Sequence, residues 1–325
     1  MLLQDNFGRK INYLRLSVTD RCNMRCRYCM PSTGVAKLGH QDVLSYEQLY
    51  RLAQSAVAIG IEKIRVTGGE PLVRKGIIDF LARLSQLPGL EQLVLTTNGL
   101  LLSELANPLK SAGVQRLNIS LDSLRPEVFA KVTRRDTLDK VLAGIDAAEQ
   151  VGLPVKINMV VMRGINDEEL IDFANMTLEK NCSVRFIEYM PAVKETNWQS
   201  LVVPGEEILT RIAAQHSFTP VVRGALAGPA REYKIAGAQG TIGVITALSG
   251  HFCQDCNRIR ITATGKIRNC LFADTEYDLA NDLASGDAAA LQATLRCLIA
   301  DKPARHEMDE QAARHAAFSM ASIGG

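Results

Sequence analysis

The chain has 325 residues, 47% of them hydrophobic, so it can bury a full core and fold without disulfide bonds. Its 37 basic and 35 acidic residues give a net charge of +2, which argues against nucleic acid or a membrane surface as the partner. The start of the chain lacks the apolar core of a signal peptide, and no apolar run reaches membrane-spanning length. We therefore expect a cytoplasmic protein, in which clustered cysteines indicate metal or redox chemistry.

Six β-rich runs alternate with helical patterns in the first two thirds of the chain. They begin at Tyr13, Lys63, Leu93, Arg116, Val155 and Val184. Apolar residues at helical spacing fill segments such as 45–59 and 139–151, and a glycine follows each of these two. This alternation predicts an α/β fold, a partial (βα)6 TIM-like barrel over residues 1–220. Glycine-punctuated short strands and a helical end near residues 275–300 predict a smaller C-terminal domain over residues 221–325.

One face of the predicted strands is polar, whereas the interior of a closed eight-stranded barrel is filled mainly with branched apolar side chains. Burying several cations without partners would be costly, so the pattern favours a hydrated chamber that holds an anionic ligand. The alternative is that these residues lie at strand ends or pair with Asp122 and Glu188. The polar face contains Arg15, Ser17, Lys63, Arg65, Thr67, Thr96, Asn98, Asn118, Ser120, Asp122, Lys156, Asn158 and Arg185.

A first cysteine group follows the first predicted strand, in the segment TDRCNMRCRYCMP. Cys22, Cys26 and Cys29 therefore lie on a loop at the carboxyl end of the sheet, where barrels of this type place their chemistry. Structural zinc usually takes four ligands, and this segment offers three. Three thiolates at CxxxCxxC spacing can instead each hold one iron of a 4Fe-4S cluster and leave the fourth iron open for a cofactor or substrate.

A second cysteine group, Cys253, Cys256 and Cys270, also offers three thiols and fits a second 4Fe-4S cluster with an open iron. Zinc is a competitor here, because His251 could complete a Cys₃His site. Arg258 and Arg260 favour the cluster, since alternate arginines project to one face of a strand and could grip an anionic or oxygen-rich ligand.

The CxxxCxxC spacing beside a βα strand, followed by TGGEP at residues 67–71, resembles the radical S-adenosylmethionine (SAM) enzymes. In that superfamily the open iron chelates SAM, and an electron from the cluster cleaves it to methionine and a 5′-deoxyadenosyl radical. Gly68 and Gly69 would let the backbone approach the methionine moiety. The resemblance implies that SAM contacts Tyr28, Gly69, Ser120 and Met190.

Further motifs narrow the resemblance to the GTP 3′,8-cyclase family. LRLSVTDRCNMRCRYCMP, IRVTGGEPLVRKG, LTTNG, NISLDSL, VKINMVVMRGIND, RFIEYMP, FCQDCNRIRITATGKIRNCLF and the terminal IGG occur in that family in this order. The resemblance implies conversion of GTP to 3′,8-cyclo-7,8-dihydro-GTP, the first step of molybdenum cofactor biosynthesis, through hydrogen abstraction at ribose carbon 3′. It places GTP against the second cluster and assigns to GTP the residues Arg15, Lys63, Arg65, Thr96, Lys156, Arg258 and Arg260.

The same resemblance assigns later steps of the reaction to Arg185 and makes Gly324 and Gly325, in a tail that threads toward the active site, functional candidates. It implies cyclic pyranopterin monophosphate synthase as the downstream enzyme and an electron donor such as flavodoxin or ferredoxin, and it is compatible with a homodimer. Two alternatives remain open. One is a radical SAM peptide maturase with an auxiliary cluster, and the other is a zinc-stabilised binding protein on a partial barrel.

Overall fold

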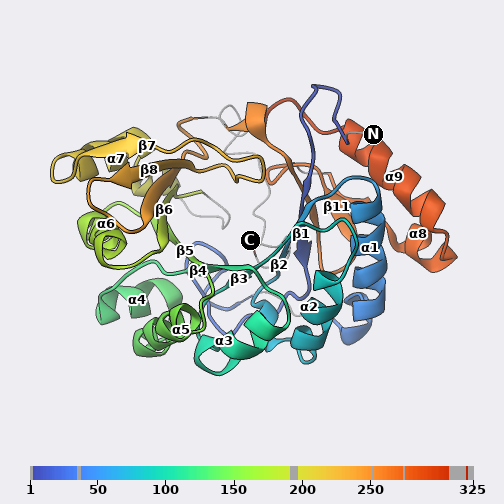
Figure 1. The fold of residues 1–325 in the computed structure, drawn as a ribbon, viewed down its shortest axis with the longest axis horizontal. Helices are drawn as coiled ribbons and strands as arrows, with labels where there is room; N and C mark the ends of the chain where they lie inside the picture. Colours follow the sequence, from blue (N-terminus) through green and yellow to red (C-terminus); the bar gives the residue numbers. More distant parts are fainter. Residues whose placement is uncertain are drawn as a thin grey trace.

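The computed structural model describes residues 3–34, 38–190, 197–250, 252–273, 275–306 and residue 320. Six parallel strands follow one another in chain order and form the middle of one curved sheet (Figure 1). This arrangement, with a helix after most strands, confirms the predicted partial barrel. The strands are β1 (Tyr13–Ser17), β2 (Lys63–Thr67), β3 (Gln92–Thr97), β4 (Arg116–Ser120), β5 (Val155–Val161) and β6 (Ser183–Glu188).

Strands from the later part of the chain extend both edges of this sheet. At one edge β10 (Arg258–Ile261) pairs in parallel with β1, and β11 (Lys266–Arg268) and β12 (Tyr277–Asp278) continue antiparallel. At the other edge β9 (Thr241–Ile245) pairs in parallel with β6, followed by β8 (Arg231–Ile235) and β7 (Phe218–Pro220). A separate domain beginning after residue 220 therefore stays a prediction, since the later segment shares the sheet of the barrel.

Helices cover the outer side of the sheet (Figure 1). The predicted helix at residues 45–59 is present, and its N-terminus is closed by a capping box in which Ser45 and Gln48 each accept a backbone hydrogen bond from the other. The outer helices are α1 (Tyr46–Ala58), α2 (Ile77–Ser85), α3 (Leu102–Ser111), α4 (Pro126–Thr133), α5 (Leu138–Gln150) and α6 (Leu170–Glu179), with α7 (Gly205–Ala213) beside α6.

The helical end predicted near residues 275–300 is wrong at its start, because residues 277–278 form the edge strand β12. Two helices follow, α8 (Ala280–Ser285) and α9 (Ala288–Ala300), separated by Gly286 in the left-handed conformation with φ of 70°. Helix α9 packs against α1, so the last described helix lies beside the first (Figure 1).

The two faces of the central strands differ as the alternation predicts. The apolar residues on the outer face are fully or nearly fully buried under the helices and form the core, for example Leu14, Leu16, Ile64, Val66 and Ile119. The polar residues point to the concave side. Short 3-10 turns at residues 40–42, 71–73, 167–169, 198–201 and 253–255 complete the connections. In the described residues, no helix has both the length and the apolar character needed to cross a membrane.

Candidate active site

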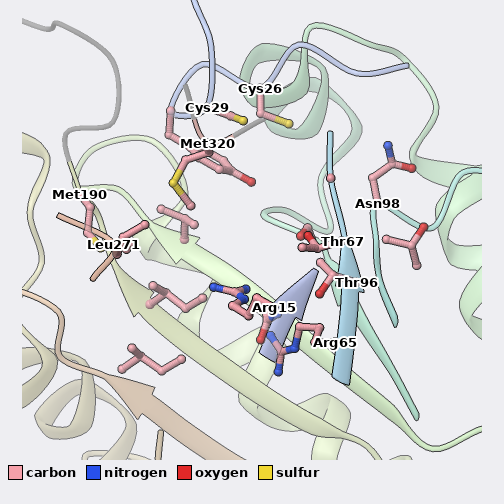
Figure 2. A pocket seen from close by; sticks show the side chains of 18 of the residues that line it. Arg15, Cys26, Cys29, Arg65, Thr67, Thr96, Asn98, Met190, Leu271 and Met320 are labelled. Atoms are coloured by element: carbon pink, nitrogen blue, oxygen red, sulfur yellow. The ribbon is translucent and has the colours of Figure 1, made fainter. Parts of the chain in front are cut away.

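The concave side of the sheet encloses a cavity of about 220 Å³ that the first cysteine group shares with the polar face. Figure 2 shows the thiols of Cys26 and Cys29 on the loop after β1, across from the guanidinium groups of Arg15 and Arg65. Of the residues that the sequence assigned to a cluster, to SAM, to GTP or to catalysis, those that line this cavity are Cys22, Cys26, Cys29, Tyr28, Gly69, Ser120, Met190, Arg15, Arg65, Thr96, Arg185, Arg258 and Arg260.

The glycines of the TGGEP segment pack directly against the loop that leads into the cysteines. The amide of Gly69 donates to the carbonyl of Thr19 at 2.7 Å, and the amide of Glu70 donates to the carbonyl of Arg21 at 2.7 Å. A Cβ on Gly69 would lie 2.4 Å from the Arg21 oxygen. Because residue 69 has no side chain, its backbone can pack directly against the loop that leads into the cysteines. This packing is a second reason for a glycine here, besides the close approach of a cofactor to the backbone.

Two buried carboxylates hold the walls of the cavity together. The Glu70 carboxylate accepts hydrogen bonds from the amides of Leu72 and Asn98 and from the Thr97 hydroxyl. Asp122 accepts the Tyr28 hydroxyl at 2.9 Å and the Val160 amide at 2.9 Å. Asp122 therefore orients the aromatic ring that lies between the second and third cysteines of the first group.

Several cationic and hydroxyl groups of the polar face carry buried atoms without a hydrogen-bond partner. These atoms are Nε of Arg15, Nε of Arg65, Nε of Arg185 and Oγ1 of Thr96, and all four residues line the cavity. Buried polar groups are normally satisfied, so such a set marks a place where a ligand supplies the partners. The groups that lack partners are donors and a hydroxyl, which fits an anion.

Lys63 and Lys156 do not line this cavity, although both belong to the predicted polar face. Lys63 is 1% exposed, and its Nζ atom donates to the Leu226 carbonyl at 2.9 Å and lies over the ring of Tyr13. Burial, together with the nearby cations, lowers the pKa of Lys63 to about 6.

Two cations of the polar face are paired with a carboxylate that the sequence analysis did not identify. Glu232 on β8 accepts from Lys156 at 2.8 Å and from Arg185 at 2.7 Å. The alternative pairing with Asp122 and Glu188 is wrong for both carboxylates. The Glu188 carboxylate accepts from the amides of residues 205, 248 and 249 and from the Ser249 hydroxyl, whereas the Asp122 carboxylate accepts from the Tyr28 hydroxyl and the Val160 amide.

The second cysteine group lines a smaller cavity of about 50 Å³ next to the first. Cys253, Cys256 and Cys270 all face it. Arg258 and Arg260 line both cavities, as alternate residues of β10 can. These two arginines therefore connect the surroundings of the two cysteine groups.

The two groups sit in different electrostatic environments. Burial raises the pKa of Cys26 well above its usual value, and Asp122 adds to the effect. Burial would also raise the pKa of Cys256, but Arg258 and Lys302 lower it to about 6. Among the described residues, no three His, Cys, Asp or Glu side chains lie so that they could hold one metal ion together. The zinc alternative depends on His251, which lies outside the described residues.

The tail glycines Gly324 and Gly325 also lie outside the described residues. Met320, five residues before the end of the chain, does line the larger cavity, and Figure 2 places it near Cys29. The part of the tail that the structure describes is thus at the site.

Sequence reasoning missed Glu70, Asp122 as the partner of Tyr28, and Glu232. The glutamate of TGGEP was visible as part of the motif, and its place after a strand was the available signal. For Glu232 the sequence held no signal, because its role depends on the pairing of β8 with β9.

Comparison with known proteins agrees with this geometry. Residues 16–177 match the radical SAM superfamily, and residues 182–308 match the family Molybdenum Cofactor Synthesis C. The crystal structure of Streptococcus suis SuiB bound to S-adenosylmethionine shares the fold, with a TM-score of 0.62 and 14% identity over 94% of this chain and 67% of that one.

Two curated relatives cover the whole length. A GTP 3′,8-cyclase of Geobacter sulfurreducens is 63% identical over 100% of both chains. One from Moorella thermoacetica is 46% identical over 99% of this chain and 100% of its own. On this identity and coverage, the chain belongs to the GTP 3′,8-cyclase family of radical SAM enzymes.

Proposed function

We propose that this chain is a radical SAM GTP 3′,8-cyclase that converts GTP to 3′,8-cyclo-7,8-dihydro-GTP in the first step of molybdenum cofactor biosynthesis. Family membership supports the reaction. The observation that carries the proposal is that one cavity joins the first cysteine group to cations with unpartnered buried atoms. A radical source and a polyanionic substrate would meet there.

The donor sets fit the cofactors, which are two 4Fe-4S clusters and SAM. Cys22, Cys26 and Cys29 would hold the first cluster, and Cys253, Cys256 and Cys270 the second, since each triplet faces a common cavity. When bound, the first cluster and SAM supply the 5′-deoxyadenosyl radical that takes hydrogen from ribose carbon 3′.

The residues for SAM would be Tyr28, Gly69, Ser120 and Met190, which surround the first triplet in the same cavity. Tyr28 would contact the adenine, held in place by Asp122. Gly69 keeps the TGGEP loop against the cysteine loop, so the binding walls keep their spacing.

GTP would bind between the two triplets. Arg258 and Arg260 line both cavities and would bind it next to the second triplet, while Arg15, Arg65 and Thr96 would donate to the triphosphate through atoms that lack partners. Lys63 and Lys156 would also bind the triphosphate, once Lys63 leaves the Leu226 carbonyl and Lys156 leaves the Glu232 carboxylate. Arg185, which lines the same cavity, would act on the later steps, and Gly324 and Gly325 remain functional candidates of the tail.

The partners of the proposed reaction are a low-potential electron donor such as flavodoxin or ferredoxin and cyclic pyranopterin monophosphate synthase, which would use the product. A homodimer belongs to the proposal as well, and sedimentation of the cluster-loaded protein tests it.

The test is an anaerobic incubation of the iron- and sulfide-reconstituted protein with SAM and a strong reductant, with and without GTP, followed by chromatography. We expect GTP-dependent formation of 5′-deoxyadenosine and matching consumption of GTP. SAM cleavage with intact GTP would favour a peptide maturase. Zinc without acid-labile sulfide would favour a binding protein.

Three cysteine variants test which triplet is needed for SAM cleavage and which for GTP conversion. Cys22→Ala should abolish SAM cleavage, because the first cluster loses one of its three protein ligands. Cys256→Ala should keep part of the SAM cleavage and lose GTP conversion. Cys297→Ala, at an exposed cysteine on α9, is the matched control and should keep both activities.

A further inference from the structure

Three neighbouring strands bring one arginine and one glutamate together across a glycine. Arg185 on β6 is the register partner of Gly243 on β9, and Gly243 is the register partner of Glu232 on β8. Because Gly243 has no side chain, the two charged side chains can meet over the middle strand. A Cβ at residue 243 would be in van der Waals contact with Cγ of Glu232, at 3.4 Å.

Glu232 binds two cations at once. Its Oε1 atom lies 2.8 Å from Nζ of Lys156 and 2.7 Å from a terminal nitrogen of Arg185. Burial would raise the pKa of Glu232, but Arg185 and Lys156 lower it to about 2, so the carboxylate stays charged at neutral pH. The other groups facing these cations include Arg65 and Arg116, which are also positive, and Lys63, whose pKa of about 6 leaves it mostly neutral at pH 7.

Glu232 contacts only part of the Arg185 guanidinium group. Arg185 lines the cavity of the first cysteine group, and its Nε is buried without a partner, whereas its terminal nitrogen is bound to Glu232. Glu232 itself does not line that cavity but faces a neighbouring one, so it stands behind Arg185 as seen from the proposed substrate.

We propose that Glu232 is a positioning residue that serves as an internal counter-anion, holding Lys156 and Arg185 at the polar face until the triphosphate of the substrate arrives. The inference rests on the proposed function. The carboxylate reduces repulsion among the cations in the ligand-free protein and competes with phosphate for Lys156. Removing its charge while keeping its shape therefore has two opposite effects, a less stable ligand-free protein and tighter binding of a polyanion.

The test uses cluster-loaded protein under anaerobic conditions, without SAM, and inorganic triphosphate as the probe. Glu232→Gln should lower the unfolding temperature without the probe, and calorimetry should show a dissociation constant for triphosphate about ten-fold smaller than in the unchanged protein. Saturating triphosphate should restore most of the lost unfolding temperature. Glu207→Gln is the matched control, since Glu207 also joins two cations, Arg163 and Arg211, outside both cavities.

A merely structural role predicts another outcome. If Glu232→Gln lowers the unfolding temperature as Glu207→Gln does, without tighter triphosphate binding, the inference is wrong while the proposed function stands. If the unchanged protein neither binds triphosphate nor consumes GTP, both fail. Gly243→Val offers a second variant with the carboxylate intact, because its side chain would stand on the middle strand between the register positions of Arg185 and Glu232. It should bind triphosphate more tightly as well, and unchanged or weaker binding would contradict the inference.

Discussion

Replacing Lys63 by methionine should stabilise the ligand-free protein, although it removes a hydrogen bond. Lys63 is 1% exposed and has a pKa of about 6 against an ordinary 10.5, through burial and the nearby Arg116 and Arg65. Keeping this side chain neutral at pH 7 costs about 5 kcal/mol, since each pKa unit corresponds to about 1.4 kcal/mol. The lost bond to Leu226 offsets about 1 kcal/mol. We expect a net gain of about 4 kcal/mol in the free energy of unfolding.

The gain should depend on pH in a defined direction. Between about pH 6 and pH 10.5 the unfolded chain carries a proton on Lys63 that the folded chain lacks, so this group makes stability rise with pH. Methionine removes that slope, and the advantage of Lys63→Met should shrink to about 1 kcal/mol at pH 9. Anaerobic urea titrations of both proteins at pH 7, 8 and 9 measure the difference.

The same variant separates stability from binding. If the triphosphate recruits Lys63 in its charged form, GTP binding at pH 8 takes up a proton, which calorimetry in buffers of different ionisation enthalpy detects. Lys63→Met should lose this proton uptake and bind GTP more weakly. A variant that is no more stable than the unchanged protein, or an advantage that does not vary with pH, would refute the reasoning.

Three further substitutions test residues that hold the loops and strand ends of the barrel in place. Gly69→Ala should abolish SAM binding in equilibrium dialysis, because its Cβ would meet the Arg21 carbonyl at 2.4 Å and displace the cysteine loop. Tyr28→Phe should raise the KM for SAM several-fold and lower stability by about 1 kcal/mol, through loss of the bond to Asp122, and an unchanged KM would contradict this role for the hydroxyl. Glu188→Gln should cost roughly 2 to 3 kcal/mol in urea titrations, since each carboxylate oxygen accepts two hydrogen bonds and the NH₂ group that replaces one of these oxygens cannot accept any.

The sequence predicted the strands and their faces because local alternation determines both. Arg15, Arg65 and Thr96 were placed on one polar face, and the structure confirms that they line one cavity. Pairing between distant segments leaves no local pattern. The sequence therefore did not reveal that β9 and β10 extend the two edges of the barrel sheet, or that Glu232 meets Arg185.

The lysines show a different limit. Strand alternation put Lys63 and Lys156 on the same side as the arginines, and the side is correct. The contacts of each lysine depend on its position along the strand and on the segments that pack against that end of the strand. Lys63 lies at the first residue of β2 and is bound by the Leu226 carbonyl, while Lys156 is bound by Glu232. Periodicity gives the face of a residue but not its neighbours.

The pairing of β1 with β10 affects the order in which the protein can form. Tyr13 is aligned with Arg258, so β1 gains one of its two neighbours only after residue 258 has been synthesised. Until then that edge of β1 exposes unpaired backbone groups, which are prone to pair with other chains. Chains that stop before residue 258 keep this edge open, and we expect them to aggregate even though all six central strands are present.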